Sequence, residues 1–264
     1  MKDVQNQADL RGIPIQKVGV NDVHLPFQIK TKSGSFQSVL ACIRLTVDLP
    51  QEYKGTHMSR FIEVLSDWRQ KPVSNREMDA MLRDIMNRLG AQRAHIEIRF
   101  KYFIEKVAPV SGLKSLLDYD CVFEGDLGPA GQLNFILGIA VPFTSLCPCS
   151  REISDYGAHN QRGVMKVRIK YVPGRFIWIE DLVELMERQG SCPVYPLLKR
   201  EDEKFVTEKA YDNAKFIEDV LRDLVLALRG LDGATWFEVE CESFESIHNH
   251  SAYAFHEEGD KTPA

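Results

Sequence analysis

The chain has 264 residues, 44% of them hydrophobic and 27% charged, which is the composition of a globular protein with an ample core. Its net charge of −5, with both signs interspersed, gives no electrostatic footprint for nucleic acid or an anionic membrane. The N-terminus lacks the apolar stretch of a signal peptide and no later run reaches membrane-spanning length, so we expect a cytoplasmic protein.

The first half of the chain predicts strands and helices in a regular order. Ile43, Leu45 and Val47 alternate with polar residues, which is typical of a half-buried strand. Ser74 and Glu77 form a capping-box pattern that begins a helix. In chain order we expect a strand at 38–48, a helix at 58–68, a helix capped by Ser74 and ended by Gly90, and strands at 95–103 and 115–123.

The second half repeats this order. We expect strands at 133–143 and 165–171, helices at 179–188 and 211–229, and a strand at 237–242, with residues 197–204 as a loop before the long helix. A repeat of roughly 130 residues is too long for a solenoid and indicates two tandem ββααββ modules, at 1–128 and 129–264. We therefore predict an α+β fold whose open antiparallel sheets close into a barrel with other subunits.

The densest cluster of chemically reactive residues is Cys147-Pro148-Cys149, with His159 twelve residues after Cys147. If the backbone stays extended through Pro148, the two thiols share one side. Thiolate and imidazole suit zinc or a similar divalent ion, and no second Cys or His pair lies nearby to complete a zinc-finger pattern. The same pattern also fits two buried thiols and a loop histidine, so both interpretations stay open here.

Three further segments contain candidate site residues. His248 and His250 lie two apart, as on one side of a strand, and can bind metal or transfer protons, although two exposed strand histidines are more often polar surface residues. Glu245 in the same segment is a weaker candidate. Glu201 lies in a charged run that could hold a metal, although such a run is usually only a solvated loop. Glu218 lies near the start of a helix, where the helix dipole alone favours a carboxylate. Basic and hydroxyl side chains before the first helix suit phosphate, although the P-loop spacing is absent.

Taken together, these stretches resemble GTP cyclohydrolase type IB, the prokaryotic form of the first enzyme of tetrahydrofolate synthesis. The matching motifs are residues 54–61, 142–150, 156–163, 202–208 and 244–253. The resemblance implies the tunnelling fold and a homotetramer with active sites between subunits. It also implies conversion of GTP and water to 7,8-dihydroneopterin triphosphate and formate.

The resemblance further implies a role for each candidate. The metal, Zn²⁺, Mn²⁺ or Fe²⁺, is expected at Cys147, His159 and Glu201. His248 or His250 is expected to protonate the ring nitrogen, while Cys149 supports the metal or proton transfer. Glu218 is expected to anchor the guanine. The candidates for the triphosphate are Lys54, His57, Ser59, Arg60 and Arg162.

Two alternatives remain from the sequence. An NADPH-dependent nitrile reductase of the same fold would use one thiol as a nucleophile on a deazapurine, but the second thiol and the histidine pair favour the cyclohydrolase. A non-enzymatic binding protein with structural zinc would need a closed site of four ligands.

Overall fold

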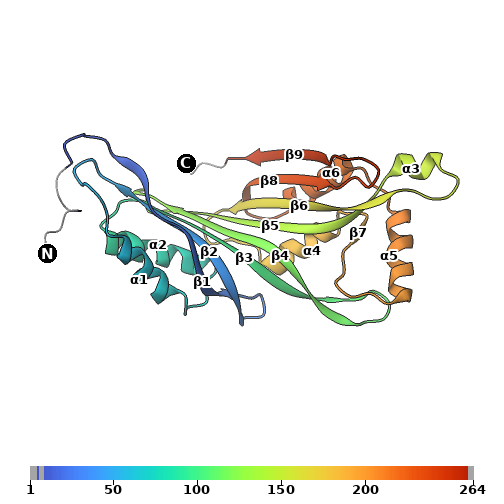
Figure 1. The fold of residues 1–264 in the computed structure, drawn as a ribbon, viewed down its shortest axis with the longest axis horizontal. Helices are drawn as coiled ribbons and strands as arrows, with labels where there is room; N and C mark the ends of the chain where they lie inside the picture. The colour runs from blue at the N-terminus through green and yellow to red at the C-terminus, as the bar shows by residue number, and fades with distance from the viewer. Residues whose placement is uncertain (1–4, 6–8, 261–264) are drawn as a thin grey trace. The chain divides into compact units, whose positions relative to one another are not determined.

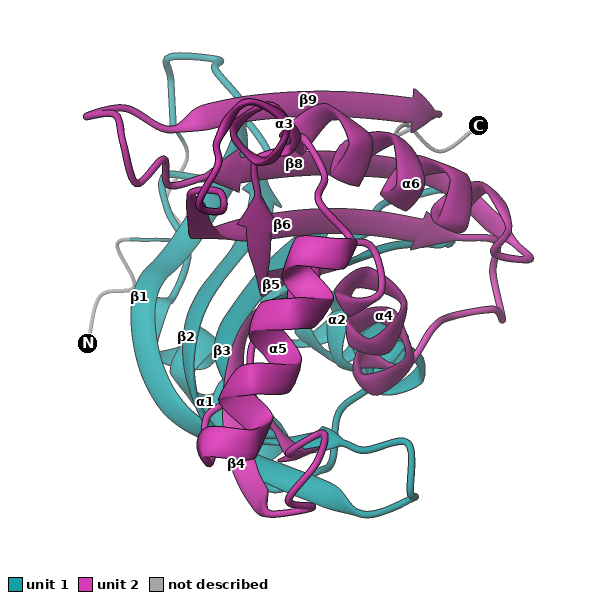
Figure 2. Cartoon of the chain, turned by 90° about the vertical axis from the view of Figure 1, so that its right-hand side faces the viewer, with its two compact units in different colours: residues 1–101, 121–137 teal, residues 102–120, 138–264 magenta. Residues whose placement is uncertain are grey.

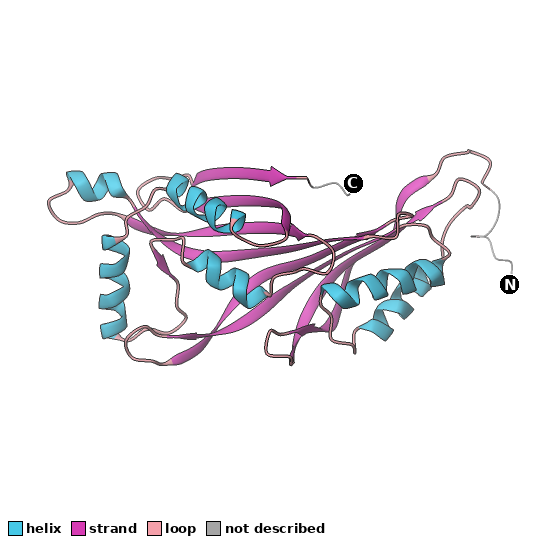
Figure 3. Cartoon of the chain, turned by 180° about the vertical axis from the view of Figure 1, so that it is seen from behind, coloured by secondary structure: helices cyan, strands magenta, loops and turns pink. Residues whose placement is uncertain are grey.

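The structure, a computed structural model, describes residue 5 and residues 9–260. Hydrogen bonds join the strands of these residues into one nine-stranded sheet in the order β1-β2-β3-β4-β5-β6-β8-β9, with β7 beside β5 (Figures 1 and 3). The pairs β1–β2, β2–β3, β6–β8 and β8–β9 are antiparallel, as the sequence predicted. Among the described residues, no helix is long and apolar enough to cross a membrane.

Close contacts divide the chain into two compact units, shown in different colours in Figure 2. Unit 1 comprises residues 1–101 and 121–137, and unit 2 comprises residues 102–120 and 138–264. These units are defined by contacts in space, whereas the modules 1–128 and 129–264 are defined by the repeat in element order, and the division into modules stays a prediction.

Unit 1 contains two helices and the strands that they cover. Helices α1 (Met58–Trp68) and α2 (Asn75–Leu89) accompany strands β1 (Ile15–Lys30) and β2 (Phe36–Leu49), together with parts of β3 (Ala94–Val107), β4 (Lys114–Leu127) and β5 (Leu133–Leu146). Alternate residues of β2 and β3 are fully buried, and so are the apolar stripes of both helices; this core includes Ile43, Leu45, Ile96, Ile98, Phe61, Leu65, Met81 and Ile85.

The predicted boundaries of α1 and α2 are confirmed. The Glu77 carboxylate accepts hydrogen bonds from the Ser74 backbone N–H at 3.0 Å and from the Ser74 hydroxyl at 2.6 Å. These bonds satisfy donors that a helix start otherwise leaves unpaired. At the other end, Gly90 has φ of 65°, a left-handed conformation that glycine adopts without strain.

Unit 2 repeats the sheet and helix layers with additional elements. It holds α3 (Pro148–Ile153), β6 (Asn160–Tyr171), α4 (Ile179–Glu187), β7 (Cys192–Pro193), α5 (Arg200–Asp212), α6 (Ile217–Arg229), β8 (Ala234–Ser243) and β9 (Ala252–Gly259). The apolar stripe of α6, including Val220, Leu224 and Leu228, is buried with the inward residues Val167, Val239 and Cys241 of the sheet.

The single helix predicted at 211–229 is wrong, because the chain forms two helices there. Asn213 interrupts the helix, and its side-chain amide donates to the carbonyls of Gly190 and Ser191, both at 3.1 Å. The Lys215 N–H donates to Leu146 O at 3.2 Å instead of continuing the helical ladder. The loop predicted at 197–204 is also wrong from Arg200 onward, because α5 begins there.

Candidate active site

The thiol of Cys147 lies where β5 ends and α3 begins. Pro148 occupies the first turn of α3, where its missing N–H costs nothing, and Cys147 is the N-cap residue. The Cys147 Sγ accepts the Ser150 N–H at 3.4 Å. Because α3 starts directly after Cys147, the backbone does not stay extended through Pro148, and the condition for the two thiols to share one side of a strand is not met. Cys147 is half-buried, whereas Cys149 is exposed on α3.

The segment before β6 brings His159 to Cys147. The Cys147 N–H donates to His159 O at 3.2 Å, and the His159 N–H donates to Ser150 Oγ at 3.2 Å. Ser150 therefore contacts both predicted ligands, one through its backbone and the other through its hydroxyl. We call Cys147, Ser150 and His159 the thiol–imidazole hub. Cys147 and His159 are thus neighbours through a backbone hydrogen bond, and their role as metal ligands stays a prediction.

Behind the hub lies a polar network that sequence reasoning largely missed. The His159 Nδ1 is 2.9 Å from Gln161 Oε1 and 4.0 Å from the Glu245 carboxylate. The Gln161 amide also donates to Ser243 Oγ at 3.3 Å and to Glu245 at 3.2 Å. Glu245 was a weak candidate, and Gln161 was not one. Gln161 lies two residues after His159 at the start of a strand, and this spacing is the signal that would have placed Gln161 and His159 on one side of the chain.

The start of α6 lies at the same end of unit 2. Besides the Lys215–Leu146 backbone bond, the Ser145 hydroxyl donates to Lys215 O at 3.3 Å. This joins the α6 N-terminus to the last residues of β5, directly before Cys147. Glu218, in the first turn of α6, is exposed. Its carboxylate is therefore available to a ligand near the hub.

The histidine pair also lies at this end, in the loop between β8 and β9. The prediction that these residues lie on a strand is wrong, since β8 ends at Ser243 and β9 begins at Ala252. The rings of His248 and His250 nevertheless stack, with centroids 5.0 Å apart and planes at 12°. The loop begins beside β6, where the Phe244 N–H donates to Arg162 O at 2.9 Å. Arg162 is exposed at the start of β6.

Glu201 is the predicted ligand that the structure does not bring to the hub. It is exposed in the first turn of α5, next to the buried Asp202. The Asp202 carboxylate accepts the Ser111 hydroxyl at 2.7 Å and the backbone N–H groups of Val110 and Ser111 at 2.8 and 2.9 Å. Burial alone would raise the pKa of Asp202, but these bonds together with the Lys199 N–H hold that pKa below its usual range.

The opposite end of α5 is the one that contacts α3 (Figure 1). The Arg151 guanidinium donates to Tyr211 O at 2.8 Å. Since a helix rises about 1.5 Å per residue, Glu201 lies roughly 16 Å along α5 from Asp212. Among the described residues, no group of three or more His, Cys, Asp or Glu side chains is arranged to hold a metal ion. The chain thus brings Cys147 and His159 together at one end of α5 and places Glu201 at the other.

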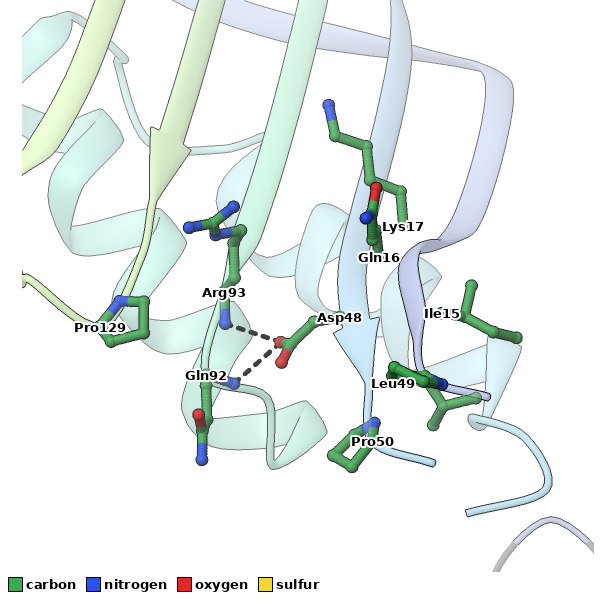
Figure 4. A pocket seen from close by; sticks show the side chains of 10 residues that line it. Ile15, Gln16, Lys17, Asp48, Leu49, Pro50, Gln92, Arg93 and Pro129 are labelled. Carbon is green, nitrogen blue, oxygen red and sulfur yellow. Dashed lines mark hydrogen bonds between the residues drawn. The ribbon is translucent and has the colours of Figure 1, made fainter. Parts of the chain in front are cut away.

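The remaining candidates belong to unit 1. His57 is the N-cap residue of α1, and Ser59 and Arg60 lie exposed in its first turn, with Lys54 exposed just before it. Unit 1 also has a cavity of about 460 Å³ where β1 begins and β2 ends (Figure 4). There Asp48 accepts the backbone N–H groups of Gln92 and Arg93 at 3.0 and 2.7 Å. None of the predicted site residues lines this cavity.

Comparisons with known proteins identify relatives along nearly the whole chain. A family model described as type I GTP cyclohydrolase folE2 matches residues 1–254. Proteins named GTP cyclohydrolase FolE2 from Geotalea uraniireducens and Geobacter sulfurreducens are 57% and 54% identical over 254 residues, covering 96% of this chain and 92% and 96% of theirs. One from Magnetococcus marinus is 51% identical over 263 residues, covering 99% and 97%.

A solved structure confirms the fold. Uricase from Arthrobacter globiformis superposes with a TM-score of 0.58 at 5% identity, covering 94% of this chain and 95% of that one. At this identity the likeness concerns the fold alone. The predicted antiparallel α+β architecture of the tunnelling-fold class is therefore confirmed.

Proposed function

The chain belongs to the type I GTP cyclohydrolase FolE2 family, and from this premise we propose how its residues convert GTP and water to 7,8-dihydroneopterin triphosphate and formate. The observation that carries the proposal is the thiol–imidazole hub at the end of unit 2 where Glu218 and the histidine pair also lie. The relatives have the cyclohydrolase name, so the family assignment leaves the nitrile reductase alternative without support.

The hub fits the divalent metal that this activity requires. The Cys147 thiol and the His159 imidazole are ligands that Zn²⁺ and other borderline divalent ions, including Fe²⁺ and Mn²⁺, accept. Gln161 occupies the Nδ1 side of His159, which leaves Nε2 for a metal. When bound, the ion supplies Lewis-acid chemistry that lowers the pKa of a water for attack at purine C8.

We propose that Glu201 of a neighbouring subunit completes this ligand set in a homotetramer. The supporting observation is the position of Glu201 at the end of α5 away from α3, with Asp202 anchoring that end. A closed symmetric oligomer repeats each contact, so every hub would meet one such glutamate. In the described part of the chain β1 and β9 are the edge strands of the sheet, and apart from the Ile29–Val73 bridge no strand covers their outer sides, so the predicted barrel can close on them.

Substrate contacts follow from the charges at the hub end. A Glu218 carboxylate can accept two parallel N–H bonds from the guanine edge. The stacked His248 and His250 are imidazoles at this end of unit 2 that can act as general acids, and we propose that one of them donates a proton to the imidazole-ring nitrogen as the ring opens. We propose that Cys149, which is exposed on α3, supports proton transfer.

We propose that the triphosphate binds the residues already predicted, namely the exposed Lys54, Ser59, Arg60 and Arg162 and the half-buried His57. The N-terminus of α1 adds free backbone N–H groups of the kind that anions prefer. No disulfide bond is found at any of the six cysteines, all of which lie within residues 9–260, and this agrees with the proposed cytoplasmic, reducing compartment.

The direct test is to incubate the full chain, loaded in turn with Zn²⁺, Mn²⁺ and Fe²⁺, with GTP and to follow formate release and pterin fluorescence. Cys147→Ala and His159→Ala should abolish turnover and lower metal content. Retention of full metal content by both variants would refute the proposed ligands. Formation of no product with any of the three metals would refute the proposed reaction.

A further inference from the structure

The Gln161 amide lies in a buried position where its orientation is fixed by its neighbours. Gln161 is 9% exposed and Ser243 is 1% exposed. The amide nitrogen is 3.3 Å from Ser243 Oγ and 3.2 Å from Glu245 Oε1. An ionised carboxylate only accepts hydrogen bonds, so the group that faces Glu245 must be the NH₂. The flipped amide would set two oxygens against each other at this distance in a buried site.

The amide orientation determines the protonation pattern of His159. With its NH₂ on Glu245, Gln161 presents Oε1 to His159 Nδ1 at 2.9 Å. An amide oxygen only accepts, so Nδ1 carries the proton and Nε2 keeps the lone pair. The Ser246 hydroxyl approaches the same Oε1 at 3.5 Å and occupies its second acceptor site. The Glu245 carboxylate thus orients the Gln161 amide, and the amide in turn selects the tautomer of His159.

We propose that Gln161, oriented by Glu245 and Ser243, is a positioning residue that fixes the tautomer of His159 and so makes Nε2 the metal-binding nitrogen. This inference rests on the proposed metal site. A histidine that ligates a metal usually donates its other N–H to a fixed acceptor, and loss of such a partner weakens metal binding by about 10–100-fold. The effect acts on metal affinity itself, before any turnover.

The chain offers a swap that separates positioning from simple packing. Gln161→Met removes the acceptor, so Co²⁺ binding should weaken by about 10–100-fold. Gln161→Glu places two carboxylates where an amide and a carboxylate now lie 3.2 Å apart, and it should also weaken binding. In the double variant Q161E/E245Q, the new amide at position 245 donates to the new carboxylate at position 161, which still accepts from His159. Binding should return to within a few-fold of the parent protein.

The dissociation constant for Co²⁺ is measured on the full, assembled chain by competition with a chromophoric chelator, alongside thermal unfolding of the metal-free protein. Gln189→Met is the matched control. The half-buried side-chain amide of Gln189 donates to the Leu185 carbonyl at 2.8 Å, so the substitution should leave Co²⁺ affinity unchanged. Cys147→Ala and His159→Ala test the site itself.

Each result decides between the two levels of the proposal. If both ligand variants retain Co²⁺ affinity, the metal site is wrong and the positioning role falls with it. If they lose Co²⁺ while Gln161→Met retains parental affinity, the site stands and the positioning role is refuted. A double variant that binds no better than Gln161→Met would also refute it, since only the exchange of donor and acceptor predicts recovery.

Discussion

Mixed oligomers test whether Glu201 acts across a subunit boundary. Cys147→Ala and Glu201→Ala should each be inactive alone, because each lacks one proposed ligand. A 1:1 mixture that assembles at random should recover about one quarter of parental activity. A site is intact only when its hub comes from the Glu201→Ala chain and its glutamate from the Cys147→Ala chain, and each condition holds for about half of the subunits.

The structure gives the reason to expect this recovery. Within one chain, Glu201 lies roughly 16 Å along α5 from the end that contacts α3, whereas metal ligands surround an ion at about 2.0–2.3 Å. The two variants are unfolded together, refolded, loaded with Zn²⁺ and assayed for formate release from GTP. A mixture of Cys147→Ala with His159→Ala is the control and should stay inactive, since both ligands belong to one hub. Absence of recovery in the first mixture, with oligomers shown to exchange subunits, would refute ligation across subunits.

Three further predictions concern the substrate, acid stability and the thiols. Glu218→Gln should raise the KM for GTP by about 10–100-fold, because a hydrogen bond to a charged group contributes about 1.5–3 kcal/mol; an unchanged KM would exclude guanine binding there. Because the pKa of Asp202 is lower in the folded chain, its ionised carboxylate stabilises the fold above the unfolded value near 3.9, and this stabilisation is lost as the pH falls from that value through the folded pKa. Asp202→Asn should therefore flatten the acid side of a plot of the urea midpoint against pH, and an unaltered acid side would contradict this. A thiol reagent at neutral pH should label exposed Cys149 first and Cys241 only on unfolding, because burial raises the pKa of Cys241 to about 12; early labelling of Cys241, read by mass spectrometry, would contradict its burial.

Local signals in the sequence were sufficient for much of the fold. The α1 boundaries, the Ser74–Glu77 cap and the alternation along β2 depend on neighbours within a few residues, and they hold in the structure. In β5 the predicted alternation holds only from Ile139 onward, because residues 136–139 are all buried. The break between α5 and α6 has no such local signal. There the Asn213 amide finds carbonyls more than 20 residues away, and this tertiary contact outweighs the helical pattern.

The same distinction applies to the candidate site. The proximity of Cys147 and His159 follows from a short turn-rich segment, so spacing alone indicated it. The role of Gln161 depends on Ser243 and Glu245, which are 82 and 84 positions further along the chain. The distance of Glu201 from the hub depends on how α5 is anchored. The sequence pattern at 197–204 indicates a loop, so it gives no information about the position of Glu201 on a helix.

The separation in sequence between Gln161 and its partners also constrains the order of events during synthesis. The network behind His159 cannot form until residues 243–246 have left the ribosome and β8 has paired with β6. Contacts of such long range form late, because the chain between them must be ordered first. A nascent chain ending within α6 would contain Cys147, His159 and Gln161 yet lack Ser243 and Glu245, which orient the Gln161 amide. Metal binding at the proposed site is therefore expected to follow translation rather than to nucleate folding.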